Sequence, residues 1–393
     1  MPGSIPLPGA RTPGDFSTVA PPSTDIVVVG AGVVGLACAA ALSRRGMGVI
    51  VLERNARAGE EASSHNSGVV HAGLYYPAGS LKAACCVEGA RNLSARCERL
   101  GIPHRRTGKL IVATNEEERS ALDEIEARAI AAGVTSLERF DKRELSRREP
   151  DLSAVEALWS PETGIVDAAA LTDSYRREAL ERGASLVLNT NVVGLEPDGD
   201  SWCVRTENTR GEREALTTPW VVNAAGLGAD GVLALAGVDV DAAGLRHFPC
   251  KGVYFSLGRG APRPRAALVY PVPEQGGLGI HLTVDLGGRC LAGPDARYVE
   301  RVDHTVDPSL ATAFAASVSR YLPGVTAEHL SPDQAGIRPK LSPPGGAFRD
   351  FVVADGATLG VPKSVHLLGI ESPGLTAAAA LADRVAEIVS RSP

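Results

Sequence analysis

The feature that most constrains this 393-residue sequence is a glycine-containing segment at 25–55, DIVVVGAGVVGLACAAALSRRGMGVIVLERN. The apolar runs at 26–29 and 48–52 have the length and composition of buried strands, and the alanine-rich stretch between them is typical of a closely packed helix. Gly30, Gly32 and Gly35 supply, in that order, a tight turn, a close approach to a pyrophosphate and close helix–sheet packing. The segment therefore predicts a Rossmann-like unit in which a helix N-terminus faces the phosphates of a dinucleotide.

The acidic residue Glu53 ends the second strand, eighteen residues after Gly35. A carboxylate in this position accepts hydrogen bonds from an adenosine ribose. The unit by itself does not separate NAD from FAD, because both share the glycine pattern. NAD enzymes usually continue with further parallel strands, whereas here a polar loop at 60–77, EEASSHNSGVVHAGLYYP, follows directly. An ordinary βαβ unit with glycines and no cofactor is the alternative.

Composition limits the classes of partner. The length and the 44% hydrophobic content favour two domains. The net charge of -6 disfavours binding to nucleic acid, since proteins that bind phosphate backbones carry basic patches. No apolar run reaches the roughly 18 residues that a membrane-spanning helix needs. We therefore expect no membrane span and a cytoplasmic location, with a peripheral membrane contact as an option.

Cysteine usage and the first residues complete this picture. The seven cysteines include no CxxC pair, which suits neither a disulfide framework nor a zinc site. We expect a reducing compartment and no bound metal. Residues 1–24 are rich in Pro, Gly and Ser and lack a charged start followed by an apolar block, so they predict a disordered tail. A weak targeting sequence is the alternative interpretation of this tail.

Three later segments suit an extended cofactor such as FAD, which needs contacts from widely separated parts of a chain. ASLVLNTNVVGLEPDGDSWCVRTEN predicts two strands, the first of which offers its backbone to an adenine. WVVNAAGLGAD predicts a buried strand followed by a turn of small residues, and VHLLGIESPGLTAAAA predicts a strand, a turn and a helix whose free N–H groups and positive dipole end face forward. The residues concerned are Val192, Ala225, Gly226, Gly374, Leu375 and Thr376.

Taken together, the chain resembles the FAD-dependent oxidoreductases of the D-amino-acid oxidase and glycine oxidase type, and within them the L-2-hydroxyglutarate dehydrogenase/oxidase branch. The stretches that carry the resemblance are SSHNSGVVHAGLYYPAGSLKA, CKGVYFSL, YPVPEQGGLGIHLT, AGIRPKL and LLGIESPGLTA, spread over about 25–389. One departure is GIVDAAAL, where Ala168 and Ala169 replace the Ser and His of the usual G-I-V-D-S-H pattern. This departure bears on the substrate more than on the fold.

The resemblance implies an α/β fold with a discontinuous Rossmann-like FAD-binding domain at 25–105, 160–240 and 333–391. It also implies an antiparallel-sheet substrate (cap) domain at 106–159 and 241–332. The patterns of KLIVAT, KGVYFSL, AALVYPVP, GLGIHLTVDL and RCLAGPD agree with sheet strands, and EEERSALDEIEARAIAAG agrees with one covering helix. One face of alternating strands can then line a polar substrate site.

The resemblance and the chemistry of the polar loop together predict the FAD contacts. Ser63 and Ser64 would hydrogen-bond the pyrophosphate or the ribityl chain, and glycines such as Gly68 would let the backbone pass beside the isoalloxazine ring. His65 and His71 would stand near the flavin, with hydrogen bonds inside the loop as the structural alternative. The full set of expected FAD-binding residues is Gly30, Gly32, Val33, Val34, Gly35, Glu53, Arg54, Ser63, Ser64, His65, Asn66, Ser67, Gly68, Val192, Ala225, Gly226, Gly374, Leu375 and Thr376.

Two cations in AGIRPKL are candidates for holding the substrate. Arg338 matches the arginine that binds the substrate carboxylate in glycine-oxidase relatives, and a guanidinium grips a carboxylate with two parallel hydrogen bonds. Lys340, two residues on, would point to the same side of an extended strand. We expect it to hold the second carboxylate of a dicarboxylic substrate. A structural ion pair is the alternative for Arg338.

The general base is expected to be a histidine, because an imidazole titrates near neutrality. His281 in GIHLT is on an expected cap strand, and His71 is its rival; a structural role is the alternative for each. Tyr270 matches a position near the substrate in relatives, or else is an aromatic packed under the cap sheet. Lys251 in CKG matches a position common in the family, for which we favour a structural role near the flavin.

These expectations together predict FAD-dependent oxidation of an L-2-hydroxy acid, with L-2-hydroxyglutarate as the expected substrate and 2-oxoglutarate as the product. The electron acceptor would be oxygen or a quinone-linked carrier. An amine or amino-acid oxidase on the same scaffold is one alternative, and release of ammonia or amine distinguishes it. A nucleotide-binding protein without catalysis is another, against which the concentrated polar loop and the IRPK motif speak.

Overall fold

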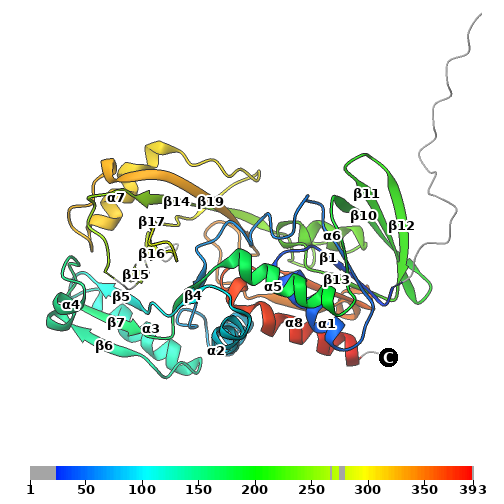
Figure 1. Cartoon of the computed structure of the whole chain (residues 1–393), viewed down its shortest axis with the longest axis horizontal. Coiled ribbons are helices and arrows are strands. Elements are labelled where there is room, and N and C mark those ends of the chain that lie inside the picture. Colours follow the sequence, from blue (N-terminus) through cyan, green and yellow to red (C-terminus); the bar gives the residue numbers. More distant parts are fainter. Residues whose placement is uncertain (1–23, 266–267, 274–278, 392–393) are drawn as a thin grey trace, which may run out of the picture.

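The computed structural model describes residues 24–265, 268–273 and 279–391, which form two lobes joined along one side (Figure 1). Thr24 is thus the only residue of the expected tail within the described part, and its Oγ1 donates a hydrogen bond to the Gly48 carbonyl at 2.7 Å. In these three ranges, no helix combines the length and the apolar character that a membrane span requires.

The first lobe is built on a six-stranded sheet in the order β20-β21-β13-β1-β2-β9. All neighbouring strands are parallel except β20, which runs antiparallel to β21. Every residue of β1 is buried, as expected for a strand covered on both faces. The strands are β1 (Ile26–Val29), β2 (Val49–Leu52), β9 (Ser185–Val187), β13 (Trp220–Asn223), β20 (Val352–Asp355) and β21 (Ser364–Leu368).

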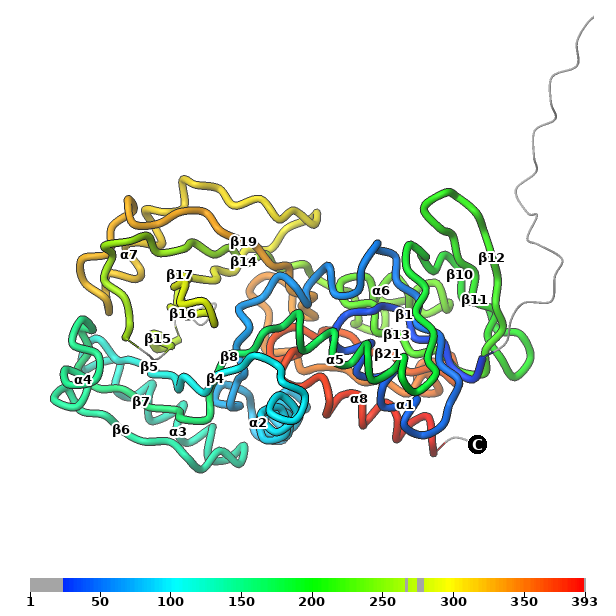
Figure 2. Tube along the Cα trace, in the orientation of Figure 1, coloured from blue at the N-terminus to red at the C-terminus, as the bar shows by residue number. Residues whose placement is uncertain are grey.

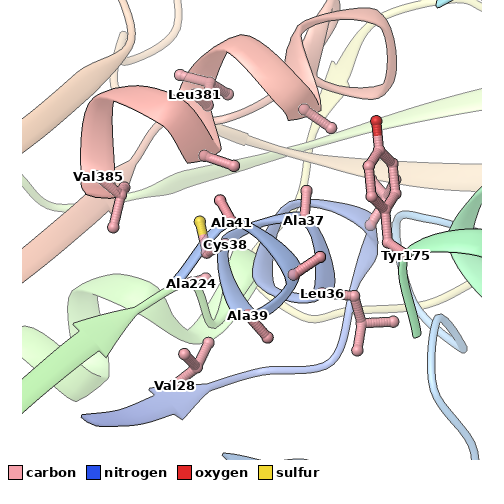
Figure 3. Close-up of a cluster of buried hydrophobic side chains, with 14 of the residues drawn as sticks. Val28, Leu36, Ala37, Cys38, Ala39, Ala41, Tyr175, Ala224, Leu381 and Val385 are labelled. Atoms are coloured by element: carbon pink, nitrogen blue, oxygen red, sulfur yellow. The ribbon is translucent and has the colours of Figure 1, made fainter. Parts of the chain in front are cut away.

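Four helices pack on or beside this sheet: α1 (Val33–Arg44), α2 (Leu81–Leu100), α5 (Ala168–Glu181) and α8 (Gly374–Arg391). Figure 3 shows the alanine-rich α1 between α8 and β1, with Tyr175 of α5 beside it. Small side chains let these helices approach closely. At Gly89 of α2, for example, a Cβ atom would lie 2.1 Å from the carbonyl oxygen of Thr376 in α8.

On the other face of the same sheet, a three-stranded antiparallel sheet follows β9: β10 (Thr190–Asp198), β11 (Ser201–Asn208) and β12 (Arg213–Thr218). The short helices η1 (Gly226–Gly228) and α6 (Ala229–Leu235) follow β13, and η4 (Gly356–Leu359) follows β20. Buried residues of β10, β11 and β12 share an apolar cluster with those of β1 and β13. This packing places the start of β10 against the carboxyl ends of β1 and β2.

The second lobe contains a larger sheet with nine described strands, in the order β18-β14-β17-β16-β15-β5-β7-β6 with β19 paired to β14. The strands are β5 (Lys109–Ala113), β6 (Glu138–Asp141), β7 (Glu156–Ser160), β14 (Phe248–Leu257), β15 (Leu268–Pro271), β16 (Leu282–Val284), β17 (Cys290–Ala292), β18 (Arg297–Tyr298) and β19 (Leu330–Lys340). The helices of this lobe are α3 (Arg119–Ala131), α4 (Lys142–Arg148), η2 (Pro308–Leu310), α7 (Ala311–Ser319) and η3 (Ala327–His329).

Two details of this sheet differ from the expectation. The sheet is mixed, because β5 and β15 run parallel while its other described strand pairs are antiparallel. The expected domain boundary at 333 falls inside β19, whose ladder with β14 extends from Leu330 to Lys340. Residues 330–340 therefore belong to the larger sheet, and the chain returns to the first lobe after Lys340.

A small sheet of β3 (Val69–Val70), β8 (Gly164–Val166) and β4 (His104–Arg105) lies between the lobes (Figure 2). It pairs the polar loop at 60–77 with two segments that lead into and out of the second lobe. Ala168 and Ala169 begin α5 directly after β8, where Asp167 caps the helix by accepting a hydrogen bond from Ala170 N at 2.9 Å. The departure from the family pattern is thus at a helix start.

Candidate active site

Two adjoining cavities lie at the carboxyl ends of the parallel strands, the position at which open α/β sheets bind ligands. The first-lobe cavity, about 370 Å³, is bounded by the ends of β1 and β2, the start of β10 and the turn after β13. The interlobe cavity, about 240 Å³, continues from it between the polar loop, β14, β15, β19 and the start of α8. The shared lining residues are Gly32, Ala62, Ser63, Ala224 and Gly226.

The glycine turn after β1 has no room for side chains. Gly30 has φ +102°, and a Cβ atom there would lie 2.6 Å from the carbonyl oxygen of Ala224. At Gly35 a Cβ atom would lie 2.0 Å from the carbonyl oxygen of Gly30, so this glycine serves helix–strand packing and does not line either cavity. Gly32, Val33 and the neighbouring Val34 line the interlobe cavity. The positive end of α1 therefore faces the junction of the two cavities.

Glu53 is fixed at the rim of the first-lobe cavity. Its two carboxylate oxygens accept hydrogen bonds from the backbone N–H groups of Ala31 at 2.8 Å and Asn55 at 2.9 Å, and the residue is only 7% exposed. Each oxygen keeps a further lone pair for a ligand hydroxyl. Arg54, whose Nε donates to Glu61 at 2.8 Å, lines the same cavity. The other expected residues that line it are Gly30, Gly32, Ser63, Val192, Ala225 and Gly226.

In the polar loop, the expected cofactor residues divide into two groups. Ser63, His65, Asn66 and Ser67 line the interlobe cavity, and the Ser63 hydroxyl accepts a hydrogen bond from Val33 N at 2.9 Å. Ser64 does not line either cavity: its hydroxyl hydrogen-bonds the carbonyls of Glu60 and Glu61 at 2.9 and 3.0 Å, which disfavours the expected contact with the pyrophosphate or the ribityl chain.

Two further expected cofactor residues, Gly68 and Thr376, contact the backbone of neighbouring segments and hold the polar loop in place. Gly68 packs against the carbonyl of Val166 in β8, which a Cβ atom would approach to 2.7 Å. Thr376 accepts a hydrogen bond from His71 N at 3.1 Å and donates to Val69 O at 3.5 Å, so it joins α8 to the polar loop. Gly374 and Leu375, at the start of α8, line the interlobe cavity. The side chain of Thr376 thus positions the loop, while the two residues before it border the cavity.

Arg338 of β19 lines the interlobe cavity. Its two terminal nitrogens both donate to the carbonyl oxygen of Asp295 at 3.1 Å, which fixes the guanidinium plane. Gly252 on the neighbouring β14 leaves space for it, because a Cβ atom there would lie 2.6 Å from Arg338 Nη2. In the described part of the chain, Arg338 has no carboxylate partner. Lys340, two residues on, is not among the residues that line the cavity.

His281, expected within a cap strand, lies one residue before the observed strand β16, and its ring stacks on Tyr270 of β15 with centroids 3.8 Å apart. Its Nδ1 is 3.2 Å from the carbonyl oxygen of Gly279. Because a carbonyl only accepts, Nδ1 carries the proton of the neutral ring, and among the described residues nothing occupies the lone pair on Nε2. Burial, and then the positive charge of Lys109, hold the pKa of His281 well below its usual value. Both rings line the interlobe cavity.

His71 lines the same cavity from the polar loop. Its Nε2 is 3.2 Å from the Ser372 hydroxyl, and burial together with Lys109 lowers its pKa to about 3. Both candidate bases are therefore neutral near pH 7. The two side chains are held by different contacts: His281 stacks on Tyr270, whereas His71 hydrogen-bonds Ser372 in the segment before α8.

Several residues near the cavity were missed by the sequence analysis. Tyr254, Glu371 and Ser372 line the cavity, and Glu371 forms an ion pair with the buried Lys82 at 2.9 Å. Lys109 is buried close to both histidines. In the sequence, Lys109 is a single charged residue at the start of the apolar run KLIVA. This pattern predicts an exposed strand end and not a buried cation.

Lys251 and the two alanines of GIVDAAAL lie away from the cavities. Lys251 Nζ forms an ion pair with Asp303 at 2.7 Å, which ties β14 to the segment after β18. It lines neither cavity, in agreement with the structural role that the sequence favours. Ala168 and Ala169 also line neither cavity.

Known proteins similar to this chain fall into one group. The family described as FAD dependent oxidoreductase (DAO) matches residues 25–388. The mitochondrial L-2-hydroxyglutarate dehydrogenase of Arabidopsis thaliana is 39% identical, over 95% of this chain and 85% of that protein. Its counterpart in Homo sapiens is 29% identical, over 94% and 89% of the two chains. Among solved structures, the FAD-bound L-alpha-glycerophosphate oxidase of Mycoplasma pneumoniae superposes with a TM-score of 0.83, at 25% identity and over 94% of this chain and 95% of that one. These similarities confirm the family and the fold expected from the sequence.

Proposed function

Because this chain belongs to the DAO family of FAD-dependent oxidoreductases, we propose that it oxidises an L-2-hydroxy dicarboxylate such as L-2-hydroxyglutarate to the 2-oxo acid. The observation that carries the proposal is the pairing, in one cavity, of a guanidinium without a carboxylate partner and an imidazole that is held neutral. Arg338 supplies the first and His281 the second. The plant and human relatives, which carry the name of this activity, support the choice of substrate.

The residues present fit FAD. The first-lobe cavity offers a buried carboxylate at Glu53 and a glycine cradle at Gly30 that a Cβ atom would fill. The interlobe cavity adjoins it and places the N-terminal ends of α1 and α8 at its wall, where an anionic or electron-rich group is stabilised. An extended dinucleotide is thus accommodated from one cavity into the other. When bound, FAD supplies the acceptor for the hydride that leaves carbon 2 of the substrate.

The chain's own residues then have distinct tasks. Arg338 binds the carboxylate next to the reacting carbon through its free N–H groups, since the Asp295 carbonyl uses only part of its donor set. His281 accepts the hydroxyl proton at Nε2. The Tyr270 hydroxyl is buried without a hydrogen-bond partner, so it is available to donate to a substrate oxygen. His71 is the rival base, and Lys340, the candidate that the sequence offered for the second carboxylate, does not line the cavity.

The test begins with the purified protein. It should be yellow, and anaerobic addition of L-2-hydroxyglutarate should bleach the flavin absorption far faster than addition of the D enantiomer or of L-lactate. Denaturation that releases NAD and no flavin would contradict the cofactor assignment. Bleaching by amino acids with release of ammonia, and none by hydroxy acids, would replace the proposed function by that of an amine oxidase.

The acceptor and the location are also proposals. We propose that the electrons pass to oxygen or to a quinone-linked carrier, and that the protein acts in the cytoplasm, although the plant and human relatives are named as mitochondrial. Turnover measured with oxygen and with a soluble quinone analogue separates the two acceptors. Fractionation of the native cells, followed by activity assay, tests the location.

A further inference from the structure

Lys109, the first residue of β5, is a buried lysine that contacts the lining residue Tyr270 but does not itself line the interlobe cavity. The residue is only 1% exposed, and its Nζ lies 4.7 Å from the ring centroid of Tyr75 and 4.6 Å from that of Tyr270. Within the described residues, its ammonium has no ion pair and no hydrogen bond. Two aromatic faces stabilise a cation but do not neutralise it. A buried charge kept without a counter-ion is costly, and such groups concentrate at functional sites.

Tyr270 connects this cation to the cavity. The imidazole of His281 covers one face of the Tyr270 ring at a centroid distance of 3.8 Å and an interplanar angle of 12°. Because that face is occupied, the ammonium 4.6 Å from the same centroid lies over the opposite face. Tyr270 and His281 line the cavity, whereas Lys109 does not. Lys109 is therefore separated from the imidazole by a single phenol ring.

We propose that Lys109 is a positioning residue: its ammonium holds the ring against which His281 stacks, and its charge adds to burial in opposing the protonation of His281. The inference rests on the role of His281 in the proposed function. It deepens that function, because it names a group that moves the acid limit of the reaction to lower pH. Lys109 does not itself contact the substrate in this proposal.

The titratable groups around Lys109 support this coupling. Burial lowers the pKa of Lys109 to about 7, and Cys86 of α2 acts weakly against that shift. Lys109 is in turn the second cause, after burial, of the lowered pKa of His71 and of His281. Tyr75 and Tyr270, which face the ammonium directly, both have a pKa raised by burial and stay neutral.

The sign of the effect follows from these values. Below pH 7 Lys109 is protonated, and its charge opposes the uptake of a second proton by His281. Above that pH Lys109 loses its proton and the effect disappears. Arg338 also lowers the pKa of His281, but a guanidinium stays charged at every working pH. His71 lowers the pKa of His281 as well, but with a pKa of about 3 it is neutral near pH 7. In that range, a pH-dependent change in the Lys109 variants reports Lys109.

The experiment compares the holoenzyme with Lys109→Met, which keeps the length of the side chain and removes the charge. Anaerobic flavin reduction by L-2-hydroxyglutarate is followed by stopped flow across pH. The acid limb is the fall of the reduction rate at low pH. In Lys109→Met this limb should move to higher pH, because His281 is protonated more easily. Well above pH 7 the variant should match the wild type, because the side chain at position 109 is then uncharged in both proteins. In Lys109→Arg the acid limb should stay at the low pH of the wild type, because the positive charge persists.

Two outcomes overturn the proposal. An acid limb at the same pH in Lys109→Met and wild type removes the electrostatic role. A uniform loss of rate at every pH, with no movement of the limb, assigns Lys109 to packing alone. If Lys109→Met does not fold with FAD bound, Lys109→Gln provides the neutral side chain for the same comparison.

A second readout does not depend on turnover. The chain has eight histidines, so the ring resonance of His281 can be assigned in histidine-labelled holoenzyme by comparison with His281→Asn. The resonance should titrate at higher pH in Lys109→Met than in wild type, and equal titration curves contradict the proposal. If no hydroxy acid bleaches the wild-type flavin, the proposed function fails, while this titration still tests the coupling of Lys109 to His281.

Discussion

The imidazole of His281 and the phenol ring of Tyr270 form a nearly parallel stack, with centroids 3.8 Å apart and planes 12° apart. Tyr270 lies in β15, and His281 follows eleven positions later, just before β16. The stack fixes the orientation of His281, and the Gly279 carbonyl fixes its tautomer. Both features are requirements for a general base, which must present an unprotonated nitrogen in a defined direction.

The first prediction concerns His281. His281→Ala should slow flavin reduction by about 10²- to 10⁴-fold, the usual effect of removing a positioned base. In the wild type the rate should fall only when the pH drops well below the usual titration range of histidine, because burial and Lys109 lower the pKa of His281. His71→Ala is the matched control on the polar loop. Stopped-flow reduction across pH decides: loss of the acid limb in His71→Ala and its persistence in His281→Ala would assign the base to His71.

The second prediction concerns the two cations of β19. Arg338→Met should lower kcat/KM on the order of 10²-fold or more, because it removes the partner of a desolvated carboxylate. Lys340 does not line the cavity, so Lys340→Ala should affect L-2-hydroxyglutarate and L-lactate equally. Steady-state kinetics with both acids is the measurement. A selective loss with the dicarboxylate in Lys340→Ala would restore Lys340 to the site.

The third prediction uses the unpaired hydroxyl of Tyr270. Tyr270→Phe should leave the stability of the protein unchanged or raise it slightly, since a buried hydroxyl without a partner is unfavourable. It should nevertheless lower kcat/KM by about 10-fold if that hydroxyl donates to the substrate. Ser43→Ala removes another buried unpaired hydroxyl, in α1 and away from the cavities, and should not affect kinetics. Equal kinetics in Tyr270→Phe and wild type would show that Tyr270 acts through its ring alone.

The fourth prediction concerns the glycine turn. Gly35→Ala should destabilise the first lobe by about 3 kcal/mol, the upper range for overpacking, because its Cβ would lie 2.0 Å from the Gly30 carbonyl. Gly46→Ala, with φ +82° and no heavy atom within 4 Å of the added Cβ, should cost only about 1 kcal/mol. Denaturant unfolding monitored by tryptophan fluorescence measures both, and release of FAD at lower denaturant should accompany the Gly35 change. Similar costs for the two variants would contradict the packing role of Gly35.

Local sequence was sufficient for much of the first lobe. The periodicity and the glycine spacing of 25–55 predicted β1, the glycine turn, α1 and β2, and Glu53 at the strand end, because these features depend on contacts within one short segment. The sequence predicts contacts with the pyrophosphate or the ribityl chain for Ser63 and Ser64 alike, because nothing local separates two adjacent serines. Only the folded loop decides which hydroxyl faces the cavity and which bonds its own backbone.

The sequence by itself thus determined the dinucleotide unit and the family, and it singled out Arg338 and His281 as candidates for the reactive groups. Tertiary structure alone decided which groups share one cavity. It extended β19 to Lys340, left Lys340 outside the cavity, and buried Lys109 against two tyrosines from separate segments. The physical reason is that the desolvation and charge coupling that set the pKa of His281 depend on neighbours far apart in the chain, and no local pattern encodes them.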